Sequence, residues 1–445
     1  MIRNLKTRTS VHSRHAWRFS VVVLPLSFFG ALGQLSAFAQ SGRPIPQPTP
    51  TPATVSTVPA TTFGRDKDPY KVVLPKSPGV DTNLDSLVKQ LNEAGEQGYK
   101  LISVVYRWQP KSASVRREYF VPVAILKLDD VQHEYAWFET TSNSVVTING
   151  FERKIYESAK QGFQVVDRFL ISSECNPENV LAMISGGEGE ACQLKDLFLL
   201  HRRKGAVEPR EFIVARSPVR AGFKVKNEAD LTSQIMKNLK DGFHPVEVFS
   251  KWEILLAHTE HTMEPSSDTP DVKVVMSLGL TTVREKVNAL GKQGYRLATM
   301  DKGTAVMYRY GETTKPVAYQ WLKAGDKSFD KELAKLQADG AVYRMSYPEP
   351  ANVKNRLVFE QGPVVDGERR EYKVLPLDFL VDHDGELKTP KADVQINLAD
   401  SSKKALNTLA SEGFVVRDLF VSDFVTNKVS VLLERSQDKI PVPPK

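Results

Sequence analysis

Two short segments of this 445-residue chain carry side chains that could bind a metal ion. His258 and His261 are three residues apart, which suits two ligands on one helix face, but the segment runs into Pro265 and is expected to be a loop. The run Asp382-His383-Asp384 precedes a glycine like the start of a calcium loop, yet the later acidic ligands are missing. We therefore predict a solvated loop and a strand-to-helix turn, with no metal site.

Neither the glycine-rich run of this chain nor its short motifs indicate a nucleotide site or a nucleophile. Residues 186–190 read Gly-Gly-Glu-Gly-Glu, without the lysine of a phosphate loop and with acids that would repel a phosphate. The chain has no G-x-S-x-G, H-E-x-x-H or C-x-x-C motif. The sequence predicts no catalytic residue, no cofactor-binding residue and no cofactor, although a nucleophile assembled from distant positions would leave no such signature.

The only two cysteines, Cys175 and Cys192, lie inside one insertion. In an oxidising compartment a disulfide between them would close a local loop and contribute about 3 kcal/mol in the chain-entropy model. We expect this disulfide; the alternative is a pair of partly buried thiols.

Four tryptophans fall on expected strands, and they are Trp108, Trp137, Trp252 and Trp321. Core packing is the simpler interpretation of these rings. A ring-stacking surface for glycans or peptides is the alternative.

An internal repeat positions all of these residues. Six helix-forming stretches end at a glycine, and these helix stops are Gly98, Gly162, Gly242, Gly294, Gly340 and Gly413. An aromatic residue follows at once in every copy except the fifth, where Ala341 stands. An apolar residue lies seven positions before each glycine, as expected for one stripe of a helix of three to four turns. We expect each glycine to adopt the left-handed conformation that ends a helix.

Strand-like stretches flank each helix, one before it and two after it. The sequence therefore predicts an α+β protein of about six tandem β-α-β-β modules with mostly antiparallel sheets, each covered by one helix. One helix covers only one face of a three-stranded sheet, so small a unit would be marginal alone, and neighbouring modules must bury each other's open faces. We expect the modules to pack in pairs or as a continuous array.

The repeat resembles a small bacterial domain of unknown function. The resemblance is carried by the Tyr-Lys-Val-Val strand at residues 70–73 and by the L-N-x-x-G-x-x-G-Y helix end at residues 91–99. It is good in the first and fourth copies, poor in the fifth, and spans most of residues 68–437. These motifs are structural, so the resemblance implies a fold and no catalytic residues.

The repeat and the composition divide the chain as follows. We expect a signal peptide at 1–39, a Pro/Thr-rich linker at 40–67, module 1 at 68–130, module 2 at 131–206 with an insertion at 173–193, module 3 at 207–268, module 4 at 269–313, a divergent module 5 at 314–364, module 6 at 365–437 and a tail at 438–445.

The N-terminal residues predict export. A basic stretch precedes an apolar run of about 14 residues, too short to span a bilayer, and Ala37-Phe38-Ala39 suits cleavage before Gln40. Residues 1–39 contain five basic residues and no acid. Removing these five from the 60 basic residues leaves 55 against 53 acidic residues, a net charge of +2. A nearly neutral mature chain argues against a nucleic-acid partner.

Export, a tether-like linker and repeats with structural motifs together favour a non-catalytic binding or scaffolding protein that is periplasmic or extracellular, with an unknown protein or glycan partner. The alternative is an exported hydrolase with a site between modules. We expect no transmembrane segment after signal cleavage, and the sequence leaves the oligomeric state open.

Overall fold

Every residue described below belongs to the unit that comprises residues 58–445. The computed structural model describes residues 67–437 except for 76–83, 110–118, 130, 142–147, 173–193, 207–210, 217–225, 251–252, 259–269, 278–279, 302, 312–314, 349–353, 363–368, 383–394 and 424–427.

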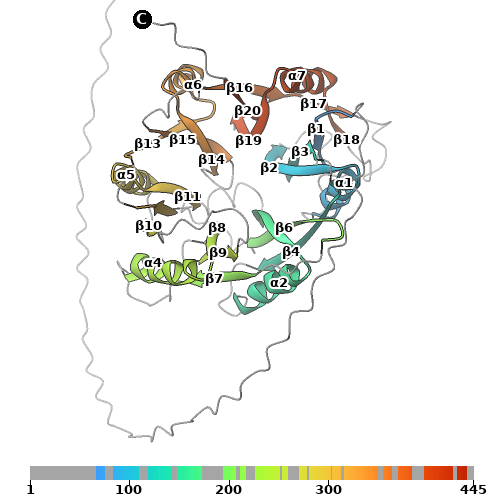
Figure 1. Ribbon diagram of the computed structural model, residues 1–445. Coiled ribbons are helices and arrows are strands. Elements are labelled where there is room, and N and C mark those ends of the chain that lie inside the picture. Colours follow the sequence, from blue (N-terminus) through green and yellow to red (C-terminus); the bar gives the residue numbers. More distant parts are fainter. Residues whose placement is uncertain are drawn as a thin grey trace, which may run out of the picture. The chain divides into compact units, whose positions relative to one another are not determined.

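The described residues form six modules of the same element order, strand, helix, strand, strand (Figure 1). Module 1 contains β1 (Tyr70–Val73), α1 (Asp85–Glu96), β2 (Tyr99–Gln109) and β3 (Tyr119–Leu128); module 2 contains β4 (His133–Thr141), α2 (Ile148–Lys160), β5 (Gln164–Ser172) and β6 (Leu194–Arg203). Module 3 contains β7 (Phe212–Arg216), α4 (Lys226–Leu239), β8 (Phe243–Ser250) and β9 (Glu253–His258); module 4 contains β10 (Asp271–Met276), α5 (Leu280–Gly291), β11 (Arg296–Asp301) and β12 (Thr304–Arg309). Module 5 contains β13 (Ala318–Lys323), α6 (Phe329–Ala338), β14 (Val342–Pro348) and β15 (Lys354–Gln361); module 6 contains β16 (Arg369–Leu377), α7 (Asp400–Ser411), β19 (Val415–Asp423) and β20 (Lys428–Gln437).

Each module has one antiparallel three-stranded sheet in which the last strand lies in the middle, as in the order β1-β3-β2. The α+β class and the repeated helix-covered units predicted from the sequence are thereby confirmed. Module 6 differs by an additional two-stranded sheet, formed by β17 (Phe379–Asp382) and β18 (Gln395–Leu398), which the repeat did not predict.

The glycines after the six helices all have positive φ, between 71° and 88°. Behind α5, the amide of Gly294 donates to the carbonyl of Gly291 (2.9 Å), and that of Tyr295 donates to Leu290 (3.1 Å). These two hydrogen bonds satisfy carbonyls of the last helical turn that have no partner within the helix, and they direct the chain into the next strand. The residues seven positions before these glycines are all buried, and they are Leu91, Ile155, Ile235, Val287, Leu333 and Leu406.

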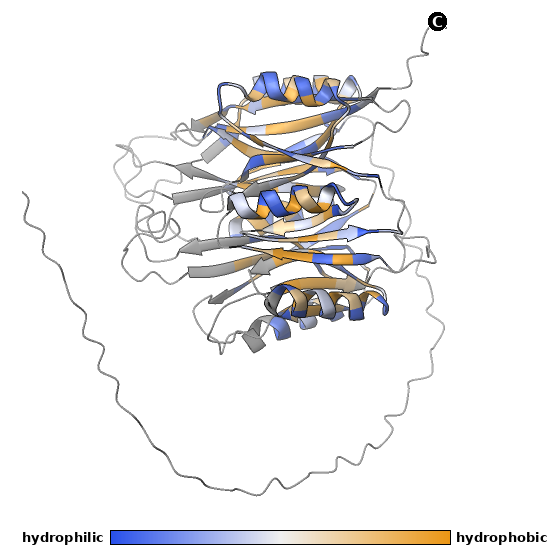
Figure 2. Cartoon of the chain, turned by 90° about the vertical axis from the view of Figure 1, so that its left-hand side faces the viewer, coloured by the Kyte–Doolittle hydropathy of each residue, from blue (hydrophilic) through white to orange (hydrophobic). Residues whose placement is uncertain are grey.

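The helices are amphipathic, and the strands that they cover are mostly apolar (Figure 2). Alternate residues of the central strand β3 enter two different cores. Ala124 and Leu126 pack with α1 and with module 2, whereas Val123 and Ile125 pack with Leu406 of α7 and other residues of module 6. Side chains of a strand alternate between the two faces of its sheet, so both faces of this sheet are buried.

The same arrangement recurs around the whole unit. Six hydrophobic clusters each combine residues of two modules, in the pairs 1/2, 2/3, 3/4, 4/5, 5/6 and 6/1. The modules therefore form a continuous array rather than three separate pairs, and the contact between module 6 and module 1 closes it. Figure 1 shows β1 and β2 beside α7 and β19, which come from opposite ends of the described chain.

Within the described residues, no helix combines the length and apolarity needed to cross a membrane.

The helix stop predicts a specific cost for losing a glycine. A Cβ at position 413 would meet Arg435 Cδ at 3.7 Å, an ordinary contact, so Gly413→Ala isolates the strain of the 87° φ. We expect about 1–2 kcal/mol of lost stability in thermal or denaturant unfolding. Gly413→Asn is the control, because asparagine tolerates this conformation better, and equal losses for both variants would contradict the prediction.

Candidate functional site

The joints between modules hold several buried polar groups, and they are the candidate functional site. At the joint between modules 1 and 2, Asn92 of α1 exchanges two hydrogen bonds with the backbone of Tyr135 in β4: the Tyr135 amide donates to Oδ1 (2.7 Å), and Nδ2 donates to the Tyr135 carbonyl (2.9 Å). The side chain of Asn92 thus takes the place of a missing strand neighbour and ties the helix to the edge of the next sheet.

A second glycine, three residues before the helix stop, permits this close approach. A Cβ on Gly95 would lie 2.3 Å from the carbonyl oxygen of His133, and one on Gly291 would lie 2.7 Å from that of Val317. Both distances are far inside van der Waals contact, and the obstacle is backbone. The glycine spacing of the L-N-x-x-G-x-x-G motif therefore serves two purposes: the second glycine ends the helix, and the first lets the next module dock.

The tyrosine hydroxyls complete the joints. The Tyr135 hydroxyl accepts a hydrogen bond from the Leu101 amide in module 1 (2.7 Å). The equivalent bonds run from the Leu297 amide to Tyr319 (2.6 Å), from the Tyr343 amide to Tyr372 (2.9 Å) and from the Val416 amide to Tyr70 (3.0 Å). Four of the six joints therefore contain the same type of hydrogen bond. In each, the tyrosine hydroxyl of one module accepts from a backbone amide of the preceding module in the closed array.

A β-bulge frees the amides that these tyrosines bind. The pairing register shifts at the same point of all six sheets, so that Ile102, Val166, Val246, Ala298, Arg344 and Arg417 are the extra residues. In the four joints above, the donating amide belongs to the residue just before the bulge. A bulge interrupts the ladder and leaves a backbone group unpaired, which the tyrosine then satisfies.

The two remaining joints use other residues in place of the tyrosine. Phe212 stands at the tyrosine position in module 3, where Arg216 pairs with Glu152 of α2 at 2.9 Å. Val272 stands there in module 4, where Glu228 of α4 accepts from the Met276 amide at 2.8 Å. These joints therefore use ionic or side-chain bonds at the partly exposed edge of the contact.

Buried carboxylates add charge to the joints around module 5. Glu360 on β15 is paired with Arg296 of module 4 (2.5 Å) and with Arg344 (2.9 Å), and it accepts a hydrogen bond from Tyr319 (3.1 Å). Burial acts to raise the pKa of Glu360, but the hydrogen bonds from the two guanidinium groups outweigh it and the pKa is lowered. Glu434 on β20 is held by Arg370 and Arg417 of its own module.

A single carboxylate connects three modules where the array closes. Asp418 of module 6 accepts hydrogen bonds from Ser103 of module 1 and from Tyr343 of module 5 (2.6 Å), and also from the amide of Leu419 (2.8 Å). Burial raises the pKa of the Tyr343 hydroxyl, and the carboxylate beside it acts in the same direction. Ser103 is buried and engaged with a carboxylate, which suits a packing role better than a nucleophile.

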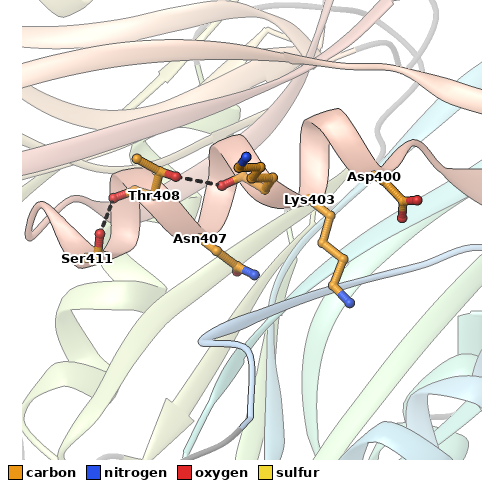
Figure 3. Close-up of a pocket in the computed structure, with 6 residues that line it drawn as sticks. Asp400, Lys403, Asn407, Thr408 and Ser411 are labelled. Atoms are coloured by element: carbon orange, nitrogen blue, oxygen red, sulfur yellow. Dashed lines mark hydrogen bonds between the residues drawn. The ribbon is translucent and has the colours of Figure 1, made fainter.

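The outer edge of the same closure carries a shallow polar hollow of about 430 Å³ along α7. It is lined by Asp400, Lys403, Lys404, Asn407, Thr408 and Ser411, all from one helix (Figure 3). Two of these residues bind Asp68 of module 1: Lys403 at 2.9 Å and Asn407 at 2.7 Å. The hollow is therefore the exposed rim of the joint between modules 6 and 1.

The residues singled out from the sequence have varied positions. His258 is the last residue of strand β9, so the expected loop is wrong for this residue, while His261 lies outside the described residues. Asp382 ends β17 and pairs with Gln395 of β18, so it belongs to a strand and not to the expected strand-to-helix turn. His383 and Asp384 lie outside the described residues, as do Cys175, Cys192 and the glycine-rich run at 186–190. The expected disulfide therefore stays a prediction.

Two of the four tryptophans have described side chains, and both pack at joints. Trp137 lies against the core shared by modules 1 and 2 and donates to Asp85 of α1 at 2.8 Å. Trp321 packs on the core shared by modules 4 and 5, with the Arg284 guanidinium 5.4 Å from its ring centroid. Core packing is thereby confirmed for these two rings.

Sequence reasoning missed the joint itself. The sequence pattern places the tyrosine of the Tyr-Lys-Val-Val segment in a strand and the Asn and first Gly of the helix end in a helix, and it does not indicate that they join two modules. The available signal was the recurrence of Asn-x-x-Gly in two copies, at 92–95 and 288–291, on a helix face that no element of the same module needs.

Comparisons with protein-family models, with curated proteins and with solved structures gave no match to this chain.

The close approach at the joint predicts that a single methyl group there is harmful. We expect Gly95→Ala to destabilise the protein by about 1–3 kcal/mol, because the added Cβ meets backbone that can move only with module 2. Thermal unfolding measures the loss. Ala410 occupies the equivalent position in α7, so Ala410→Gly is the reverse control and should cost no more than the roughly 1 kcal/mol of helix propensity. A Gly95→Ala variant as stable as the parent would contradict the docking role.

The tyrosine bond gives a second prediction. Tyr372→Phe removes the hydroxyl that accepts from the Tyr343 amide and donates to the Ala341 carbonyl (3.0 Å). Leaving a buried donor without a partner should cost about 1–3 kcal/mol and should speed hydrogen exchange of the Tyr343 amide. Tyr295→Phe, which removes a bond to Asp271 within one module, is the control and should leave that amide protected. Unchanged exchange at Tyr343 in the Tyr372→Phe variant would contradict the prediction.

Proposed function

We propose that this chain is an exported, non-catalytic repeat protein that serves as a rigid scaffold for binding another macromolecule in the bacterial envelope or exterior. The observation that carries the proposal is the closed array: all six modules share a core with both neighbours, so the outer helix faces are held in fixed mutual positions. A repeat array with fixed geometry can present many separate contact points to a large partner.

The chemistry of the joints supports a structural interpretation of the buried polar residues. Glu360, Glu434 and Asp418 are each bonded to two or more groups. These bonds join strands that lie far apart in the sequence. An enzyme site would instead need ionisable groups that face a cleft large enough for a substrate. The hollow on α7 is open, and Lys403, one of the two lysines that line it, is paired with Asp68.

The N-terminal residues support the remainder of the proposal. The basic and apolar segments before Gln40 have the pattern of a secretory signal, and the alternate prolines from Pro44 to Pro52 suit an extended tether. We also propose that each module is a copy of the small bacterial domain that it resembles, because the Tyr, Asn and two Gly positions of the shared motif all have packing roles in this fold.

The test uses the full chain in intact bacterial cells. A photo-crosslinking amino acid is placed at Lys331 in α6 and, separately, at Lys404 in α7, two exposed positions on different modules. We expect the protein in the envelope or medium fraction with Gln40 as its N-terminus, and the same crosslinked partner from both positions across replicates. A crosslinker at the buried Leu333 is the matched control and should capture nothing outside the chain.

The outcomes separate the proposal from its main alternative. Cytoplasmic retention of the intact chain would overturn export. Recovery of no partner, together with turnover of common hydrolase substrates by the purified protein, would overturn binding in favour of an exported hydrolase.

A further inference from the structure

Module 2 contains a buried pair of histidines at the face that it presents to module 1. His133 begins β4 and His201 lies opposite Tyr135 on β6; their exposed fractions are 1% and 5%. Nε2 of His201 lies 2.9 Å from Nδ1 of His133, so the two rings share one hydrogen bond. The imidazoles make none of the hydrogen bonds described above that link module 2 to module 1. Burial of two histidines in direct contact costs free energy unless every ring nitrogen has a suitable partner.

The surrounding groups fix which nitrogen carries each proton. The amide nitrogen of Gln164 lies 3.2 Å from His201 Nδ1 and can only donate, so Nδ1 accepts and the proton of His201 sits on Nε2. His201 then donates to Nδ1 of His133, which places the His133 proton on Nε2, 3.3 Å from a carboxylate oxygen of Asp129. The network thus assigns one proton to each ring, while Nε2 of His133 lies at ion-pair distance from Asp129 without a hydrogen bond.

This arrangement has room for one extra proton but not for two. One added proton can sit on His201 Nδ1 if the amide of Gln164 turns its oxygen to the ring. A second must occupy His133 Nδ1, where it would point at the N–H of His201 across 2.9 Å and place two cations in contact.

Within the His133–His201 pair, His133 lies on the segment that contacts module 1. The carbonyl of His133 is the group that approaches Gly95 of α1, and Tyr135, two residues on, binds the Leu101 amide. The Tyr135 ring also lies beside His201, with ring centroids 5.2 Å apart and the ring planes tilted by 40°. Separation of the two imidazoles therefore moves the same short segment that holds module 2 against module 1.

We propose that the contact between modules 1 and 2 is a proton-operated joint, closed when the His133–His201 pair is neutral and opened when the pair takes up a second proton.

Burial favours the neutral state of His133. Burial lowers the pKa of His133; Asp129 opposes this, while Lys100 of β2 and Arg203 of β6 add to it. Two further ion pairs lie near this contact, Lys204 with Glu96 of α1 and Arg202 with Glu134. The pKa of His133 in the folded protein lies below its unfolded value of 6.5. The neutral imidazole therefore contributes fully to stability above pH 6.5, and this contribution is lost as the pH falls below 6.5.

The experiment compares two joints in one molecule by hydrogen exchange between pH 7.5 and 5.5, corrected for the intrinsic rate. The Leu101 amide reports the joint with the histidines, and the Leu297 amide reports the joint where Tyr319 makes the same bond beside Glu360. We expect the protection of Leu101 to fall by about tenfold per pH unit for each proton taken up, while Leu297 changes little.

Two variants sharpen the test. His201→Gln keeps a donor towards His133 but cannot take up a proton, so it should flatten the pH dependence at Leu101. His244→Gln, in module 3, should leave it unchanged. Equal pH dependence at Leu101 and Leu297 in the parent protein would overturn the proposal even if neither variant folded, and so would a His201→Gln variant with the parent's pH profile.

Discussion

The structure depends on the uncovered face of a three-stranded sheet. Each module has one helix, which covers one sheet face and leaves a second apolar face open. Val123 and Ile125 on that face would be exposed in an isolated module 1, and burial in the core shared with module 6 removes them from water. Because burial of apolar surface is the main favourable term in folding, each module is stable only with a neighbour on either side.

The polar groups at the joints explain how such neighbours hold a fixed register. Apolar faces alone permit sliding, since hydrophobic attraction has no direction. The tyrosine hydroxyl accepts a hydrogen bond from the amide released by the bulge, and Asn92 pairs with the backbone of Tyr135. These directional bonds set the position of each sheet relative to the helix before it. The two joints without the tyrosine, at Phe212 and Val272, show that the register can also be set by ion pairs and side-chain caps.

Much of the fold was accessible from the sequence because its signals are local. The glycine after each helix, the apolar residue seven positions earlier and the flanking β-branched strands together predict the α+β modules and the burial of their open faces. The closure was not accessible, because the bond from the Val416 amide to Tyr70 joins residues 346 positions apart. The His133–His201 contact was missed for the same reason: it depends on strand register across an insertion, and neither histidine has a telling neighbour in the sequence.

The contact between module 6 and module 1 also limits how such a protein can change in length. An open stack of repeats can gain or lose a copy at either end, provided that its terminal copies have polar outer faces. Here no copy is terminal, since Leu406 and Phe414 of the last module lie in one core with Tyr70 of the first. Loss of one copy would expose two apolar faces at once, and an added copy would have to enter between two faces that already fit each other. The number of modules is therefore a property of the whole assembly, set by the angle at each joint.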